Sequence, residues 1–159
     1  LVYSRVSRVT LNYEEVNTTA LVKEVIESLM IPDKFTVKVA DNLPVVPYPK
    51  VNMEQIFTNL ISNAVKYHNK PAGTIEVGCH MNSDHYEFWV ADDGPGIAAE
   101  YHEKVFQIFQ TLQARDTMES TGIGLTIVKK IIEERGGTIC IESEQAQGGK
   151  FIFTVPIKV

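Results

Sequence analysis

The stretch from Met53 to Tyr67 constrains the fold more than any other part of the chain. Read as a helix, it repeats apolar side chains at steps of three and four residues, which predicts one buried face. A second, polar set keeps the same spacing along another side of the helix. The apolar set is Met53, Ile56, Phe57, Leu60, Ile61 and Ala64, and the polar set is Asn59, Asn63, Lys66 and Tyr67.

The polar set carries groups that suit a nucleotide. An Asn side-chain oxygen is a neutral, hard ligand of the kind that Mg²⁺ accepts, and the ammonium of Lys66 suits a phosphate. Tyr67 offers a flat apolar ring to a base. Taken alone, however, the stretch fits an ordinary amphipathic helix with a solvated polar side at least as well as it fits a site.

Length and charge narrow the class of protein. The 159 residues suit one domain with a real hydrophobic core. The net charge of −5, without a basic run, argues against a general nucleic-acid surface and gives no support to membrane-surface binding. There is no apolar run long enough to span a membrane and no signal-peptide pattern. We therefore expect neither a nucleic-acid partner nor direct membrane contact.

The two cysteines form no metal or redox motif. Cys79 and Cys140 lie far apart in sequence, and we interpret both as reduced core residues of a cytoplasmic domain, with a disulfide as the alternative. The four histidines lack metal-ligand spacing and are interpreted as surface or loop residues. The chain begins at Leu1 without an initiator Met, which suggests a piece of a longer protein.

The remaining pattern mixes helices and strands. Pro32 should end a helix that Asn17 or Thr18 caps, and the stretch 41–50, which holds three prolines, should lead into the central helix. The second half favours antiparallel hairpins, so the expected class is α+β, a two-layer sandwich. Strands are predicted at 11–16, 35–40, 73–81, 86–91, 138–143 and 151–155, helices at 100–109 and 125–135, and a mobile loop at 110–121.

Two glycine-containing loops could carry chemistry. Asp92 to Gly96 follows a strand, where a carboxylate can accept a hydrogen bond from an adenine amino group, although a plain tight turn explains the same residues. Thr121 to Gly124 precedes a helix, whose N-terminal amides favour an anion, although a glycine hinge is the simpler explanation. The second loop matches neither the Walker pattern nor a Rossmann setting.

The order of these signals resembles the N, first glycine, F and second glycine boxes of sensor histidine kinases. The matching stretches are Asn59 to Tyr67, Asp92 to Ile97, Val105-Phe106 with Phe109, and Thr121 to Leu125. The resemblance extends from about Asn12 to Pro156 and departs from the family at Ser120, where the second glycine box commonly begins with glycine.

The resemblance implies the family's catalytic and ATP-binding domain, which has the Bergerat fold of the GHKL superfamily. This fold is a mixed, mostly antiparallel sheet packed on three helices, with a flexible ATP lid. Residues 1–11 would be the tail of a preceding dimerisation and phosphoacceptor helix, and residues 12–159 the catalytic domain. Dimerisation in the family uses helices of that preceding domain, so a monomer is expected here.

The resemblance also implies roles for individual residues. Asn63, with Asn59 beside it, would bind Mg²⁺, Lys66 would meet phosphate oxygens, and these three form the implied catalytic set. Asp92 would accept from the adenine amino group. The lid would be Gln110 to Thr121, and Arg115 in it would contact the γ-phosphate. The other residues implied to bind ATP are Tyr67, Gly94, Gly96, Ile97, Thr121, Gly122, Ile123, Gly124 and Leu125.

The implied reaction transfers the ATP γ-phosphoryl group to a histidine of the upstream domain, for relay to a response regulator. His102-Glu103 only superficially fits the phosphoacceptor motif. One rival is an ATPase clamp of the gyrase type, but those relatives place a Glu where this chain has Asn59, and an amide is not a general base. The other rival is a nucleotide-binding module without catalysis. Whether the full protein is membrane-anchored or soluble stays open.

Overall fold

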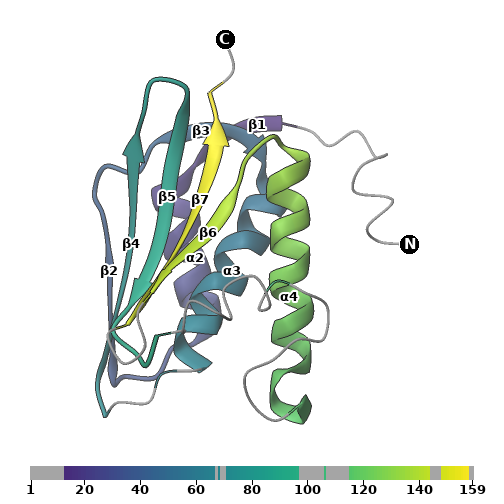
Figure 1. The fold of residues 1–159 in the computed structure, drawn as a ribbon. Helices are drawn as coiled ribbons and strands as arrows, with labels where there is room; N and C mark the ends of the chain where they lie inside the picture. The colour runs from purple at the N-terminus through teal and green to yellow at the C-terminus, as the bar shows by residue number, and fades with distance from the viewer. Residues whose placement is uncertain are drawn as a thin grey trace.

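Two layers form the fold in the computed structural model, which describes residues 13–66, 68, 71–96, 106, 115–143 and 148–157. A five-stranded sheet is one layer, and the helices on one of its faces are the other (Figure 1). The side chains of 115–123 are not described. The expected tail at 1–11 and the expected helix at 100–109, apart from Phe106, lie outside the described residues.

The main sheet has the strand order β2-β4-β5-β7-β6. Strands β2 and β4 are parallel, and every other neighbouring pair is antiparallel, so the predicted mixed and mostly antiparallel sheet is confirmed. Both predicted hairpins, β4–β5 and β6–β7, are present. The strand bounds are β2 Phe35–Val39, β4 Gly73–Met81, β5 His85–Asp92, β6 Ile139–Ser143 and β7 Gly149–Pro156.

Three helices are described: α2 Thr18–Leu29, α3 Lys50–Lys66 and α4 Arg115–Glu134. The side chain of Asn17 caps α2 by accepting from the Ala20 amide at 3.1 Å. Helix α2 ends before Pro32, because Met30 adopts a left-handed backbone with a φ of 51°. None of the helices in the described parts of the chain is long and apolar enough to cross a membrane.

Helix α4 begins earlier than expected. The sequence predicts a mobile loop up to Thr121 and a helix from Leu125, whereas the helix already begins at Arg115, so the loop assignment is wrong for 115–121. The stretch contains no proline, and a glycine inside a helix costs only about 1 kcal/mol relative to alanine, so Gly122 and Gly124 do not stop the helix. Residues 110–114 lie outside the described residues.

A small second sheet was not predicted. Strand β1, Tyr13–Asn17, pairs antiparallel with β3, Val45–Pro49. The stretch 41–50, with its three prolines, was expected only to lead into the central helix. A sheet of two strands consists only of edges, however, and an edge can accommodate Pro47 and Pro49 without losing a central ladder hydrogen bond.

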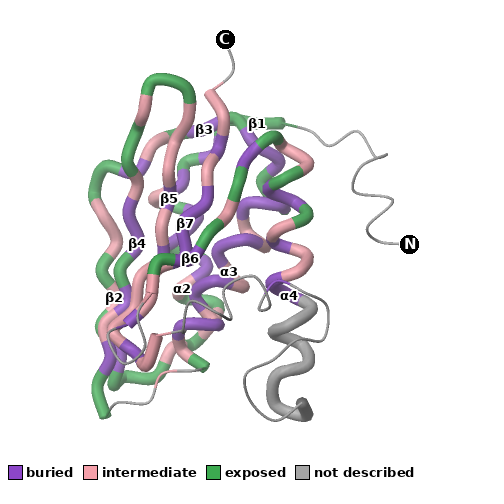
Figure 2. The backbone as a smooth tube through the Cα atoms, viewed as in Figure 1, coloured by how far each residue is buried: buried purple, intermediate pink, exposed green. Residues whose placement is uncertain are grey.

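The core lies between α2, α3, α4 and the inner face of the sheet (Figure 2). Phe57 of α3 is fully buried, and its ring centroid lies 5.8 Å from that of Phe88 and 5.5 Å from that of Phe153, in edge-to-face arrangements. All six apolar residues of the predicted α3 stripe are buried, which confirms the periodicity that predicted this helix.

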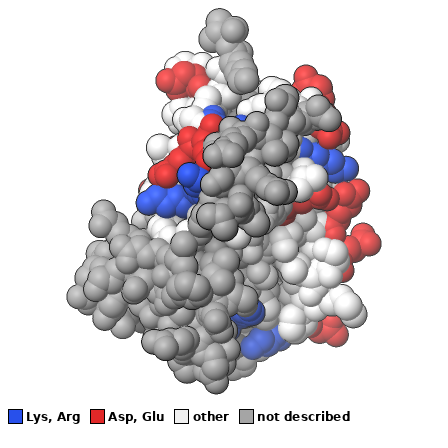
Figure 3. Space-filling model, turned by 90° about the vertical axis from the view of Figure 1, so that its right-hand side faces the viewer, with Lys and Arg blue, Asp and Glu red and all other residues white. Residues whose placement is uncertain are grey.

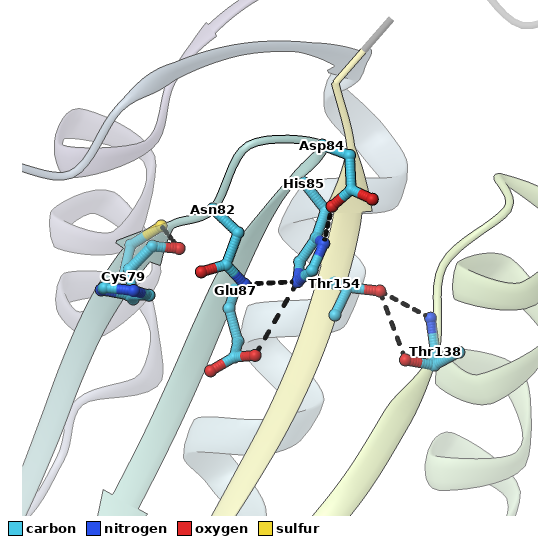
Figure 4. Close-up of polar contacts among 8 residues, drawn as sticks. Cys79, Asn82, Asp84, His85, Glu87, Thr138 and Thr154 are labelled. Carbon is cyan, nitrogen blue, oxygen red and sulfur yellow. Dashed lines mark hydrogen bonds and ion pairs between the residues drawn. The ribbon is translucent and has the colours of Figure 1, made fainter.

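Histidine forms part of the turn between β4 and β5, at the end where β5 begins (Figure 4). His85 Nδ1 donates to Asp84 Oδ1 at 2.6 Å, and Asn82 Nδ2 donates to His85 Nε2 at 2.7 Å.

Both cysteines, Cys79 and Cys140, are free thiols. Cys79 is half-buried, but Cys140 is exposed, so the expectation of a core position is wrong for Cys140 because its side chain lies on the outer face of an edge strand.

Candidate functional site

The polar side of α3 faces α4. Asn59 Nδ2 donates to the Gln55 carbonyl at 2.9 Å, which leaves Asn59 Oδ1 turned toward Gly124. A Cβ on Gly124 would lie 2.6 Å from that oxygen, so only glycine fits there without displacement. The structure therefore brings the first and last of the four predicted motifs into direct contact.

Asn63 lies one turn further along α3 and is 7% exposed. Its Oδ1 is buried and has no hydrogen-bond partner among the residues that the structure describes. A buried amide oxygen without a partner costs folding free energy, on the order of 1–3 kcal/mol, unless something else satisfies it. Because a neutral amide oxygen is a ligand that Mg²⁺ accepts, Asn63 fits the predicted metal role. Lys66 ends α3 and is exposed.

A tight loop follows β5 at residues 92–96, which we call the strand-end loop. Asp92 Oδ1 accepts from the Gly94 amide at 2.8 Å. Gly94 is buried, and a Cβ there would lie 2.9 Å from Asp92 Oδ1. Gly96 has a φ of 73°, a conformation that side chains disfavour. Both glycines are therefore required by the loop itself.

The start of β7 supports this loop, which the sequence did not reveal. Gly148 has a φ of 85°, and a Cβ on it would lie 2.4 Å from the Asp92 carbonyl oxygen. Ser143 Oγ donates to the Gly148 carbonyl at 3.0 Å. A glycine between two strand patterns predicted only a turn, because the close approach is to a residue far away in sequence.

A histidine-carboxylate pair lies behind the strand-end loop. His68 Nε2 lies 2.6 Å from Asp93 Oδ1, and the His68 side chain has no exposed surface. His68 lies in the loop just after α3, as interpreted, but its side chain is buried. Its burial depends on contacts with residues distant in sequence, so only its position next to the predicted α3 residues could have pointed to it.

The predicted F-box residue Phe106 joins the site region to α4. It is buried, its ring meets Phe151 edge-to-face at 6.1 Å between centroids, and its carbonyl accepts from Thr126 Oγ1 at 2.8 Å. Lys129 Nζ lies 5.6 Å from the centroid of the Phe106 ring. Phe106 thus packs between the last strand and the side of α4.

The other predicted site residues are placed only in part. Tyr67 and Ile97 lie outside the described residues. The Leu125 side chain is 4% exposed and belongs to the core. The expectation of glycine amides at a helix N-terminus is wrong in this structure, because Gly122 lies inside α4. Arg115, Thr121 and Ile123 are described only as backbone of α4.

Charge on the face that includes α4 is mixed. Acidic and basic side chains both occur on the visible part of this face (Figure 3). The site residues Asp92, Asp93 and Lys66 likewise bring both signs to the region of the strand-end loop and the end of α3.

Comparison with known proteins identifies the fold and its motifs. The family model described as "Histidine kinase-, DNA gyrase B-, and HSP90-like ATPase" matches residues 48–159. This chain belongs to that ATPase family. The match includes α3, the strand-end loop, α4 and the closing hairpin, so the resemblance to the histidine kinase ATP-binding domain is confirmed.

Curated relatives of this ATPase domain are much longer than the chain. Cyanobacterial phytochrome A of Nostoc sp. is 41% identical over 117 residues, which are 74% of this chain and 15% of the relative. The methanogenesis regulatory histidine kinase FilI of Methanothrix harundinacea is 37% identical over 121 residues, 76% of this chain and 13% of the relative. The chain thus spans about one seventh of either relative.

Solved structures of similar domains share the two-layer fold. Full-length ShkA in complex with AMPPNP has a TM-score of 0.80 and 28% identity, with 97% of this chain and 33% of that chain covered. The catalytic domain of histidine kinase ThkA has a TM-score of 0.75 and 29% identity, with 92% of this chain and 96% of that chain covered. These matches confirm the predicted α+β sandwich.

Proposed function

We propose that this chain is the ATP-binding catalytic domain of a two-component sensor histidine kinase. It transfers the γ-phosphoryl group of ATP to a histidine of an upstream dimerisation domain, and the phosphoryl group then passes to an aspartate of a response regulator. The contact between Asn59 and Gly124 supports this proposal most directly, together with the buried Oδ1 of Asn63 one turn away, which has no hydrogen-bond partner within the described part of the chain.

The adenine end of the nucleotide lies at the strand-end loop. The carboxylate of Asp92 accepts from the exocyclic amino group, and Gly94 and Gly96 keep side chains out of the way of the base. Tyr67 and Ile97 complete this end of the site. The fixed Asp92–Gly94 hydrogen bond supports this assignment, because it orients the carboxylate before a ligand arrives.

The phosphates lie between α3 and α4. Lys66 pairs with phosphate oxygens, and Asn63 and Asn59 hold Mg²⁺, which would neutralise charge on the phosphates. Gly122 and Gly124 leave room for the phosphate chain because they lack side chains. Arg115 contacts the γ-phosphate, and Thr121, Ile123 and Leu125 belong to the same helix beside the phosphates.

The reaction breaks the bond between the γ-phosphorus and the bridging oxygen and forms a phosphorus–nitrogen bond to the imidazole. ADP leaves, and the imidazole proton passes to a base of the upstream domain. The groups of this chain contribute position and charge stabilisation. Its side chains supply no base at Asn59, so water is poorly activated and transfer is favoured over hydrolysis.

A phosphotransfer assay tests the proposal. The chain is mixed with radiolabelled ATP, Mg²⁺ and a separately purified histidine kinase dimerisation domain, and label on the histidine is followed over time. We expect transfer that Asn63→Ala reduces at least about tenfold, the loss that corresponds to about 1.4 kcal/mol. Rapid release of free phosphate without an acceptor would instead favour the ATPase clamp. ATP binding without transfer would favour a nucleotide-binding module.

A further inference from the structure

One carboxylate joins three separate segments behind the strand-end loop. Asp93 Oδ1 lies 2.6 Å from His68 Nε2, just beyond the end of α3, and accepts from the Thr74 amide of β4 at 3.0 Å. A carboxylate can only accept, so Nε2 carries the proton of this short bond. The side chain next to the proposed adenine ligand Asp92 is thereby tied to α3 and to β4.

The imidazole has little room to move. Its ring meets Phe35 edge-to-face at 5.1 Å between centroids, and the His68 side chain is fully buried. A Cβ on Gly73 would lie 2.7 Å from His68 Nε2, and a Cβ on Gly94 would lie 3.4 Å from His68 Cδ2. Two glycines and an aromatic ring thus form a slot that fits the imidazole and fixes the direction of its N–H.

The slot includes the loop that the proposed function assigns to adenine. Gly94, which packs against His68, also donates its amide to Asp92 Oδ1 at 2.8 Å. A shift of the imidazole toward Gly94 would therefore displace Gly94, and with it the group that orients Asp92. Asp93 is 45% exposed on its side chain, so without His68 its carboxylate could turn to water and release the loop.

We propose that His68 is a positioning residue for nucleotide binding, which holds the strand-end loop through Asp93 in the shape that receives the adenine base. The inference rests on the proposed function of the same site. It differs from a purely structural histidine in one measurable respect: the hydrogen bond from Nε2 affects the affinity for nucleotide separately from the stability of the fold.

The chain provides a matched control. His85 donates to Asp84 at 2.6 Å, the same separation as in the His68–Asp93 pair. His85 begins β5 and Asp92 ends it, eight residues in all, so the two pairs lie roughly 24 Å apart along the strand. The His85–Asp84 pair is more exposed, with 29% of the His85 and 83% of the Asp84 side chain accessible, and replacing His85 removes it without touching the loop.

The experiment measures ADP affinity by calorimetry and the melting temperature for the wild type and variants. His68→Leu fills the slot without a donor and should weaken ADP binding about tenfold, as expected for one charge-assisted hydrogen bond. His68→Gln retains an N–H near the place of Nε2 and should restore affinity to within about threefold of the wild type. His85→Leu should leave ADP affinity unchanged.

Asp93→Ala breaks the same bond from the half-exposed side and should weaken ADP binding about as much as His68→Leu. The Asp93→Ala variant therefore still tests the positioning role if His68→Leu does not fold. Unchanged ADP affinity in His68→Leu or Asp93→Ala, or a His68→Gln variant as weak as His68→Leu, would overturn the positioning role while the proposed function stands. A wild-type chain that does not bind ADP would overturn both.

Discussion

Gly124→Ala tests the contact between α3 and α4. The added methyl group would lie 2.6 Å from Asn59 Oδ1, whereas ordinary van der Waals contact begins near 3.4 Å. Either α4 or the Asn59 side chain must therefore move away by about 0.8 Å. Asn59 is not free to rotate away, because its amide donates to the Gln55 carbonyl at 2.9 Å. The substitution therefore forces strain between the two helices that form the proposed phosphate site.

Two effects of opposite sign determine how much Gly124→Ala changes the free energy of unfolding. Overpacking of this kind costs about 1–3 kcal/mol, whereas alanine is better than glycine inside a helix by about 1 kcal/mol. The free energy of unfolding should therefore fall by about 1 kcal/mol in the wild-type background. In an Asn59→Ala background the clash is absent, so the same Gly124→Ala change should raise the free energy of unfolding by about 1 kcal/mol.

Urea unfolding followed by circular dichroism measures both values in a double-mutant cycle. Gly78→Ala serves as a control. Its Cβ would lie 2.2 Å from the Trp89 ring, so this variant loses stability through a contact that does not involve Asn59. Its cost should not depend on Asn59. An equal effect of Gly124→Ala in both backgrounds would refute the contact.

Three further substitutions probe the metal ligand, the core and a thiol. Asn63→Ala should abolish the gain in nucleotide affinity that Mg²⁺ provides, measured by calorimetry with and without the ion; an unchanged gain would exclude Asn63 as a ligand. Phe57→Ala should lower the free energy of unfolding by about 3–5 kcal/mol in urea, because a fully buried ring is lost, with Phe57→Leu losing less. Burial raises the pKa of Cys79 from 9.0 to about 11, so the unfolded thiol releases its proton first. Stability should fall as the pH rises between these values, and Cys79→Ala should remove that part of the fall in thermal unfolding.

Periodicity predicted the elements that carry one buried face. The helix α3 and the strands β4 and β5 could be predicted from the local spacing of their apolar residues. A helix and a strand that each bury one face repeat apolar residues with different periods, so the spacing distinguishes them. The strand β3 escaped prediction because Pro47 and Pro49 are excluded only from central strands, and the sequence does not reveal which strand is an edge.

The start of α4 was mispredicted for a different reason. Polar composition and the absence of an apolar period suggested a loop at 110–121, but a helix that already packs through Val128 and Ile132 can extend beyond its buried stripe. Local propensity is a weak term there, and packing of the neighbouring turns decides the bounds.

Contacts between residues that are distant in sequence limit how much of the site the sequence could predict. The order of the four motifs predicted Asn59, Asn63, Asp92 and Gly124 as site residues. The His68–Asp93 pair joins residues 25 positions apart, and neither residue type nor spacing shows that the imidazole is buried. The sequence likewise does not show why glycine occupies position 148. A larger residue would not fit there, because Gly148 packs against the carbonyl of Asp92.

The central claim is tested most directly by calorimetric titration of the chain with AMPPNP, with and without Mg²⁺, beside Asp92→Ala. We expect binding that tightens when Mg²⁺ is present and that Asp92→Ala abolishes while the variant remains folded by circular dichroism. Absence of binding by the wild-type chain, or equal binding by Asp92→Ala, would contradict the assignment of ATP to this site.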